Sequence, residues 1–160
     1  MRPLNHFMLE QDHLWFLRRP NLEEHTLLRI RPGGPPLGIA RWRPRPWLLG
    51  ADVLRVCEYD DRPLVFEVCR MWTLIRRHQL VDADARPVGS IGHDALLTAT
   101  GIPFVWRIVE DRAIRYHRIG GPLLASETRE AGGIGLEFVP GVETVNPFLR
   151  MLILGAVLIG

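Results

Sequence analysis

The sequence contains no lysine, so all 20 of its basic residues are arginine. Only two cysteines are present, Cys57 and Cys69, which is too few for a disulfide framework or a four-ligand zinc site. Acidic residues nearly balance the arginines, and the net charge of +2 argues against a dedicated nucleic-acid-binding protein. Arginine nevertheless gives the surface planar, forked donors that suit phosphate and carboxylate groups.

The sequence also has no hydrophobic run long enough to span a bilayer. The longest apolar run, from Phe148 to Gly160, contains Arg150. As a helix it would be about 20 Å long, whereas the hydrocarbon core of a bilayer is about 30 Å thick. The first residues show no n-region, h-region and cleavage pattern, so we expect no signal peptide. We therefore expect a cytoplasmic protein that makes peripheral contact, if any, with the inner face of the plasma membrane.

The residues that are present predict one folded domain over residues 1–160, because 47% of them are hydrophobic and 24% charged. Thirteen prolines and 15 glycines interrupt the chain too often for a helical bundle. Between these breaks lie short runs rich in Val, Ile and aromatic residues. The runs expected to pair as hairpins are 26–31 with 37–43, 53–59 with 64–70, 72–81 with 86–91, 104–109 with 113–119, and 123–128 with 134–139. Their spacing predicts a mainly β fold, an antiparallel barrel or sandwich.

The C-terminal segment has a different pattern. Asn146 is a good N-cap, Pro147 suits the first helical position, and the run from Phe148 to Ile159 is apolar on every face except at Arg150. A helix of this kind must be buried, and we expect it to thread the barrel with the Arg150 guanidinium in water at the mouth. The alternative is a helix that anchors at a membrane interface.

The N-terminal segment, residues 4–17, has apolar residues on both sides of a polar tetrapeptide at positions 10–13. We expect a strand pair with this tetrapeptide as its turn. A short amphipathic helix followed by a strand is the alternative.

Cys57 and Cys69 lie on the two strands of one expected hairpin. If Asp61 and Arg62 form the centre of its turn, the two cysteines are offset by about three residues, or about 10 Å at the rise of a strand. That separation is too long for a disulfide. We expect two buried thiols on the same face of the sheet.

The segment 41–47, Arg-Trp-Arg-Pro-Arg-Pro-Trp, combines a row of arginines with flanking tryptophans. Residues at i, i+2 and i+4 of an extended strand face one side, so the guanidiniums point the same way. Tryptophan favours bilayer interfaces and arginine is attracted to anionic lipids. The residues that we expect to bind lipid headgroups here are Arg41, Trp42, Arg43, Arg45 and Trp47. The alternative is a solvated strand edge that proline protects from pairing.

Two further basic clusters occur. Arg76 and Arg77 precede His78, and we add these two arginines to the candidate headgroup site. A third cluster falls on the hairpin 104–119, with Arg107, Arg115, His117 and Arg118. For all of them the alternative is an outward-facing side chain on a half-buried strand.

No constellation of residues predicts catalysis. Ser90, His93 and Asp94 are neighbours in sequence, but a catalytic triad depends on placement in space. The histidines match no metal-ligand spacing. We expect a protein that is not an enzyme, with no cofactor, no metal site and no nucleic-acid partner; whether it has a protein partner is left open.

Residues 64–91 (LVFEVCRMWTLIRRHQLVDADARPVGSI) and 133–160 (GIGLEFVPGVETVNPFLRMLILGAVLIG) resemble the phospholipid scramblase and LURP-one-related family. The first is similar to the family's repeating hairpins, and the second to its closing strand and Leu/Ala/Gly-rich helix. The resemblance covers roughly residues 25–160. It implies the tubby C-terminal fold, an antiparallel barrel of twelve strands around a central hydrophobic helix.

The resemblance also implies a non-enzymatic, scramblase-like protein that binds anionic phospholipid or phosphoinositide headgroups at a membrane surface. The alternative is a soluble barrel that serves as a protein-interaction or small-ligand-binding module. Where scramblases carry spaced carboxylates for calcium, this chain keeps Glu130 but has Gly132 at the second position. Calcium takes about six to eight oxygen ligands, so we expect no strong calcium site.

Overall fold

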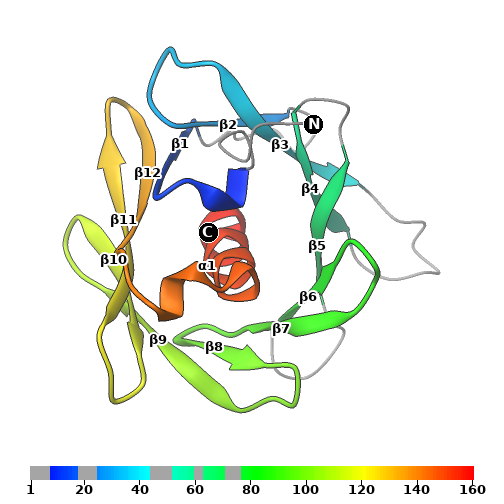
Figure 1. Ribbon diagram of the computed structural model, residues 1–160, viewed down its shortest axis with the longest axis vertical. Helices are drawn as coiled ribbons and strands as arrows, with labels where there is room; N and C mark the ends of the chain where they lie inside the picture. The colour runs from blue at the N-terminus through cyan, green and yellow to red at the C-terminus, as the bar shows by residue number, and fades with distance from the viewer. Residues whose placement is uncertain (1–7, 18–24, 44–51, 60–62, 71–76) are drawn as a thin grey trace.

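The computed structural model describes residues 8–17, 25–43, 52–59, 63–70 and 77–160. Its twelve strands form one closed antiparallel barrel around a C-terminal helix (Figure 1), which confirms the fold class expected from the sequence. The strands are β1 (His13–Phe16), β2 (Thr26–Arg29), β3 (Pro36–Arg43), β4 (Val53–Glu58), β5 (Leu64–Arg70), β6 (His78–Asp82), β7 (Pro87–Ile91), β8 (Ala95–Thr98), β9 (Pro103–Val109), β10 (Ala113–Arg118), β11 (Leu123–Glu130) and β12 (Gly133–Phe138). The helices are the short 3-10 turns η2 (Met8–Glu10) and η4 (Glu143–Val145) and the α-helix α1 (Pro147–Ile159).

The barrel closes where its first strand pairs with its last. Trp15 and Phe16 of β1 lie opposite Gly135 and Ile134 of β12, and every other pairing joins strands that are neighbours in sequence. Gly133 permits this seam, because a Cβ there would lie 2.6 Å from the Phe16 carbonyl oxygen and the Trp15 ring. Closure removes the open edges through which sheets aggregate.

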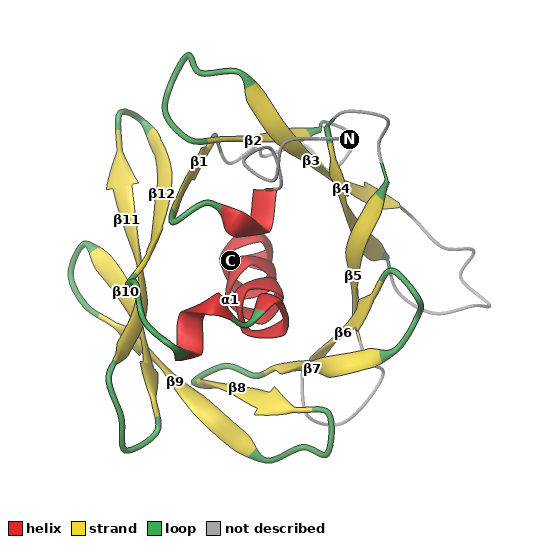
Figure 2. Cartoon of the chain, in the orientation of Figure 1, coloured by secondary structure: helices red, strands yellow, loops and turns green. Residues whose placement is uncertain are grey.

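Helix α1 occupies the middle of the barrel (Figure 2). It begins as the sequence predicts: the Asn146 side chain accepts a hydrogen bond of 3.0 Å from the Phe148 N–H, and Pro147 starts the first turn. Residues 149–157 are all buried against inward side chains of the wall such as Phe66 and Leu136. In the described part of the chain, no helix combines the length and apolar character required to cross a membrane.

One of the strands, β8, was not predicted from the sequence. β8 is only four residues long, between Gly92 and Gly101, and our hairpin series does not include it. It pairs with β7 and β9, and its Leu96 side chain is fully buried. The expected strand 72–81 corresponds to β6, which begins at His78; residues 72–76 lie outside the described residues.

The prediction of a strand pair over residues 4–17 is wrong for residues 8–17, and residues 4–7 lie outside the described residues. Residues Met8–Glu10 form η2, and β1 alone follows, paired with β2 and β12. The Met8 N–H donates to the Glu58 carboxylate at the end of β4, at 3.2 and 3.3 Å. This long-range contact turns the segment inward, where Met8 is completely buried.

The expectation that the Arg150 guanidinium reaches water is also wrong. The side chain is 7% exposed and lies over the Phe138 ring, 4.5 Å from its centroid. Its four hydrogen bonds go to the carbonyl oxygens of Thr144 (2.5 Å), Leu9 (3.2 Å) and Gln11 (2.7 Å) and to the Asp12 carboxylate (2.7 Å). Arg150 thus joins the start of α1 to the segment before β1. We call this end of the barrel, where Arg150 contacts Leu9, Asp12 and Thr144, the entry mouth.

Candidate functional site

Two of the residues predicted to bind headgroups lie together on the outer wall of the barrel. Arg41 and Arg43 of β3 are exposed, and they alternate with Ala40 and Trp42, which pack toward the core. Because successive strand residues face opposite sides, both arginines point outward. Within the described ranges, neither forms an ion pair.

Strand β4 adds a third arginine, which the sequence reasoning did not select. Arg55 lies directly opposite Arg41. Its Nε is buried without a hydrogen-bond partner, and the Glu67 Oε1 is 4.0 Å away, beyond hydrogen-bonding distance. Like charges directly opposite each other on neighbouring strands destabilise a sheet. Glu67 of β5 lies opposite Arg55 on its other side and supplies one negative charge, whereas none of the residues that line the surrounding hollow supplies one to Arg41.

The three arginines line a hollow of about 170 Å³ together with His25, Ile39 and Cys57. We call it the basic hollow. None of these six lining residues is acidic. Its chemistry is therefore that of an anion site, since guanidinium groups form strong charge-assisted hydrogen bonds with phosphate and carboxylate oxygens.

The remaining predicted site residues do not join the basic hollow. Trp42 is half-buried against the core rather than on the outer face. Arg77 is half-buried just before β6, three strands from β3, or about 14 Å at the spacing of neighbouring strands. The other three, Arg45, Trp47 and Arg76, lie outside the described residues.

The two cysteines form no disulfide, as expected. A bulge between Val56 and Cys57 shifts the register, so that Cys57 lies opposite Leu64 and Cys69 opposite Val53. Both thiols are half-buried, so the expectation of full burial is wrong. Cys57 contributes its side chain to the basic hollow.

The third basic cluster does not form one surface. The Arg115 Nε pairs with Glu110 at 3.0 Å, and Arg118 lies 5.8 Å from the centroid of the Phe104 ring. Arg107 instead lies opposite Tyr116, a core residue whose pKa is raised well above its ordinary value by burial and by the nearby Glu127 carboxylate. The protonated Tyr116 hydroxyl donates to Glu127 at 3.4 Å. Each of these three arginines thus has an interaction partner within the barrel.

His78, the first residue of β6 and the neighbour of Arg77, makes the free energy of unfolding depend on pH. Burial, and then the charge of Arg70 opposite it, lower the pKa of His78 below its ordinary value of 6.5. The unfolded chain therefore binds this proton more readily than the folded one, and the stability that His78 contributes is complete above pH 6.5 and is lost as the pH falls below it.

We expect His78→Gln to lose less stability than the wild type between pH 7.5 and pH 5.5, as measured by the melting temperature at each pH. His93→Gln is the matched control, because His93 is exposed. A wild-type pH dependence that persists unchanged in His78→Gln would show that other groups cause it.

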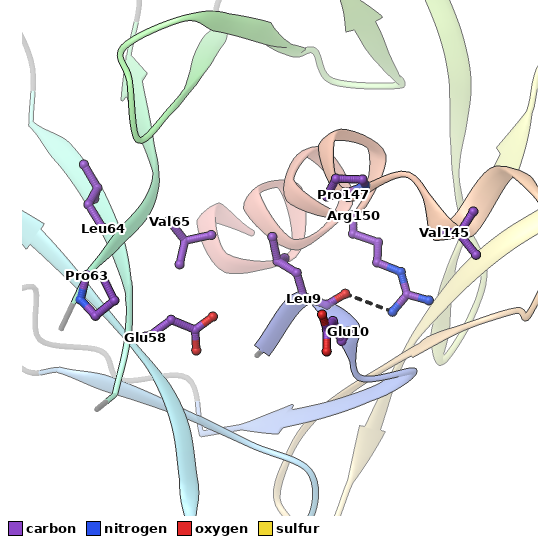
Figure 3. A pocket seen from close by; sticks show the side chains of 9 residues that line it. All are labelled: Leu9, Glu10, Glu58, Pro63, Leu64, Val65, Val145, Pro147 and Arg150. Atoms are coloured by element: carbon purple, nitrogen blue, oxygen red, sulfur yellow. Dashed lines mark hydrogen bonds between the residues drawn. The ribbon is translucent and has the colours of Figure 1, made fainter. Parts of the chain in front are cut away.

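A second cavity opens at the entry mouth (Figure 3). It measures about 640 Å³ and lies among η2, the end of β4, the start of β5 and the start of α1. Two carboxylates, Glu10 and Glu58, and the Arg150 side chain interrupt a wall that is otherwise apolar. Sequence reasoning missed this cavity because its residues come from three distant stretches of the chain and share no spacing.

The structure also shows the surroundings of Glu130, the carboxylate that we matched to the calcium-binding stretch of scramblases. Glu130 Oε1 lies 2.9 Å from His13 Nε2, and the Glu130 carbonyl accepts a hydrogen bond from the Trp15 indole. Across the ranges that the structure describes, no group of three or more His, Cys, Asp or Glu residues is placed to hold a metal ion.

Comparisons with known proteins identify no relative of this chain. No family model matches it, and no curated protein or solved structure is significantly similar to it. The resemblance to the scramblase and LURP-one-related family therefore rests on residues 64–91 and 133–160 alone.

Proposed function

We propose that this protein is a non-enzymatic, scramblase-like protein that binds phospholipid at a membrane surface, with the anionic headgroup in the basic hollow. The observation that carries the proposal is the Arg41–Arg55 pair, two like charges directly opposite each other, with the Arg55 Nε buried and lacking a hydrogen-bond partner. A phosphate oxygen between the two guanidiniums replaces their repulsion with charge-assisted hydrogen bonds. Arg43, exposed on the same face, adds to the attraction of an anionic membrane surface.

The proposal is limited to binding at the surface. Moving a lipid between leaflets requires a polar path across about 30 Å of hydrocarbon. The interior of this barrel is occupied by α1 and the apolar side chains around it. The inner face of the plasma membrane is the surface that we propose, because its anionic lipids attract clustered arginines.

Co-sedimentation with liposomes tests the proposal. We expect the wild type to bind vesicles of phosphatidylcholine and phosphatidylserine but not phosphatidylcholine alone, and to release them as salt screens the charges. Each arginine near an anionic surface contributes about 1 kcal/mol, so the triple variant Arg41→Gln/Arg43→Gln/Arg55→Gln should lose about 3 kcal/mol, or roughly 100-fold in partitioning.

The matched control is Arg86→Gln/Arg112→Gln/Arg129→Gln, which removes the same charge from three exposed positions elsewhere on the barrel. We expect it to bind nearly as well as the wild type. An equal loss in both triple variants would assign binding to net charge rather than to the basic hollow. Absence of wild-type binding to anionic vesicles would refute the proposal itself.

A second candidate function is a soluble barrel that binds a small ligand or a protein. The cavity at the entry mouth favours it, because pockets of about 300–1,000 Å³ with mostly apolar walls are typical small-molecule sites. Small-ligand binding without any affinity for vesicles would support this function over the first.

A further inference from the structure

The basic hollow and the cavity at the entry mouth meet at one pair of residues on neighbouring strands. Cys57 of β4 lines the hollow, and Leu64, the first residue of β5, lines the cavity. These two residues lie directly opposite each other in the strand pairing. Because the Cβ atoms of directly opposed residues are about 4.5–5.5 Å apart, the two sites are neighbours on the barrel.

The pairing of β3 with β4 gives the distance between the arginines and the cavity. Arg55 lies opposite Arg41, three residues before Glu58, where β4 ends in the cavity wall. Three residues correspond to about 10 Å at the rise of a strand. Between these two levels Ile39 lies opposite Cys57 and adds apolar surface to the hollow. A molecule with an anionic group and an alkyl chain is therefore long enough to occupy both sites.

The cavity itself suits an alkyl chain. Its apolar wall comes from three parts of the fold, with Leu9 from η2, Leu64 and Val65 from the start of β5, and Pro147 from the first turn of α1 (Figure 3). The volume of about 640 Å³ exceeds what a few waters need and is typical of sites for small organic molecules. Each methylene group that moves from water into such a site favours binding.

The polar groups of the cavity wall do not oppose an alkyl chain. Glu58 and the Arg150 side chain are each only 7% exposed. Both are therefore already shielded from water, and a chain packed beside them adds little to the cost of their desolvation. Glu10, the third charged residue of the wall, is exposed and keeps its hydration.

An anionic headgroup finds few hydrogen-bond donors among the residues that begin α1. Four of the five N–H groups of the Arg150 guanidinium are already donated within the protein. Pro147 has no N–H, and the Phe148 N–H is bonded to the Asn146 side chain. The arginines of the basic hollow are the better donors, so the headgroup is expected there and the chain in the cavity.

We propose that the protein binds one anionic phospholipid molecule across both sites. The phosphate lies between Arg41 and Arg55 in the basic hollow, and an acyl chain passes over the Cys57–Leu64 pair into the cavity at the entry mouth. This inference rests on the headgroup site of the proposed function and goes beyond it, because the acyl chain leaves the bilayer and packs against the protein.

Calorimetric titration with single-chain lipids, each below its micelle concentration, tests the inference. The probes are 1-octanoyl- and 1-decanoyl-lysophosphatidic acid, which differ by two methylene groups. Each buried methylene should raise the affinity about fourfold, so the decanoyl lipid should bind about 15-fold more tightly than the octanoyl lipid.

The result for anionic vesicles separates failure of this inference from failure of the proposed function. Equal affinity for the two lysophosphatidic acids, or binding of neither, would overturn the inference; if anionic vesicles are still bound, the headgroup site stands. Absence of binding to the lysophosphatidic acids and to the vesicles would refute both.

A variant of the residue at the border assigns the chain to the cavity. Leu64→Gln places an amide where the chain enters, so the affinity for the decanoyl lipid should fall at least tenfold while anionic vesicles are still bound. Leu123→Gln is the matched control, because Leu123 is the half-buried first residue of β11, as Leu64 is of β5, and lines neither site. If Leu64→Gln fails to fold, Leu9→Gln makes the same test from η2. Wild-type affinity for the decanoyl lipid in either folded cavity variant would contradict the inference.

The variant Arg41→Gln/Arg43→Gln/Arg55→Gln tests the other end of the lipid. It should weaken both lysophosphatidic acids by the same factor and keep the 15-fold ratio between them, because it removes only contacts to the phosphate. Wild-type affinity for both lipids in this variant would show that the phosphate is bound elsewhere, and would overturn the joint site.

Discussion

Replacement of Arg150 by methionine is expected to lower the free energy of unfolding by about 3–5 kcal/mol, because it removes a buried guanidinium that donates to three backbone carbonyl oxygens. Methionine fills most of the same volume but removes the Arg150 donor from the carbonyl oxygens of Leu9, Gln11 and Thr144. A fully buried acceptor that loses its donor costs about 1–3 kcal/mol, and the partly buried Leu9 and Gln11 carbonyls cost less than the Thr144 carbonyl. Urea denaturation monitored by circular dichroism measures the change.

The hydrogen bonds to carbonyl oxygens, rather than the ion pair with Asp12, should account for most of this loss. Asp12 is 57% exposed, and ion pairs at such positions contribute about 0–1 kcal/mol. Asp12→Asn should therefore cost less than about 1 kcal/mol. A loss for Asp12→Asn as large as that for Arg150→Met would show that the ion pair, not the backbone contacts, holds the N-terminal segment.

This network also explains why the N-terminal segment could not be predicted. Its polar residues 10–13 indicate a turn when only neighbours along the chain are considered. Their partners are instead distant in sequence: Arg150 bonds the Gln11 carbonyl and the Asp12 carboxylate, and Glu58 bonds the Met8 N–H. The hairpins and α1 were predictable because alternation, turn residues and the Asn146-Pro147 cap are local signals.

In the candidate site, too, residues placed by local patterns were predictable and residues placed by tertiary structure were not. Alternation along β3 is enough to place Arg41 and Arg43 on one face. The position of Arg55 opposite Arg41 depends on the pairing register of β3 with β4, which no short pattern encodes. The cavity at the entry mouth is still less predictable, because Leu9, Glu58 and Pro147 meet only once the barrel has closed around α1.

Replacement of Gly89 by alanine is expected to destabilise the protein by about 1–3 kcal/mol, the usual cost of overpacking a core. A Cβ on Gly89 would overlap the Leu97 carbonyl oxygen of β8 and lie 3.0–3.1 Å from the Leu152 methyl groups of α1. Backbone atoms cannot move aside as side-chain ends do, so the wall or the helix must shift. The melting temperature should fall by about 2–4 °C for each kcal/mol.

Gly155→Ala provides the matched comparison from the helix side of the same interface. Its Cβ would meet only side-chain ends, the Leu80 Cδ1 at 2.9 Å and the Ile91 Cδ1 and Val68 Cγ2 at 3.3 Å. Alanine also favours the helix over glycine by about 1 kcal/mol, so the net change should stay within about 1 kcal/mol of zero.

The contrast between these two variants bears on which part of the protein would make the membrane contact that we propose. If Gly89→Ala destabilises and Gly155→Ala does not, α1 is packed tightly against β7 and its neighbours, and releasing it into a bilayer would sacrifice that packing. The proposed contact with lipid is then expected on the outer wall, where Arg41, Arg43 and Arg55 lie. If both variants are neutral, α1 is loosely held, and an interfacial helix becomes the stronger explanation of any vesicle binding that resists salt.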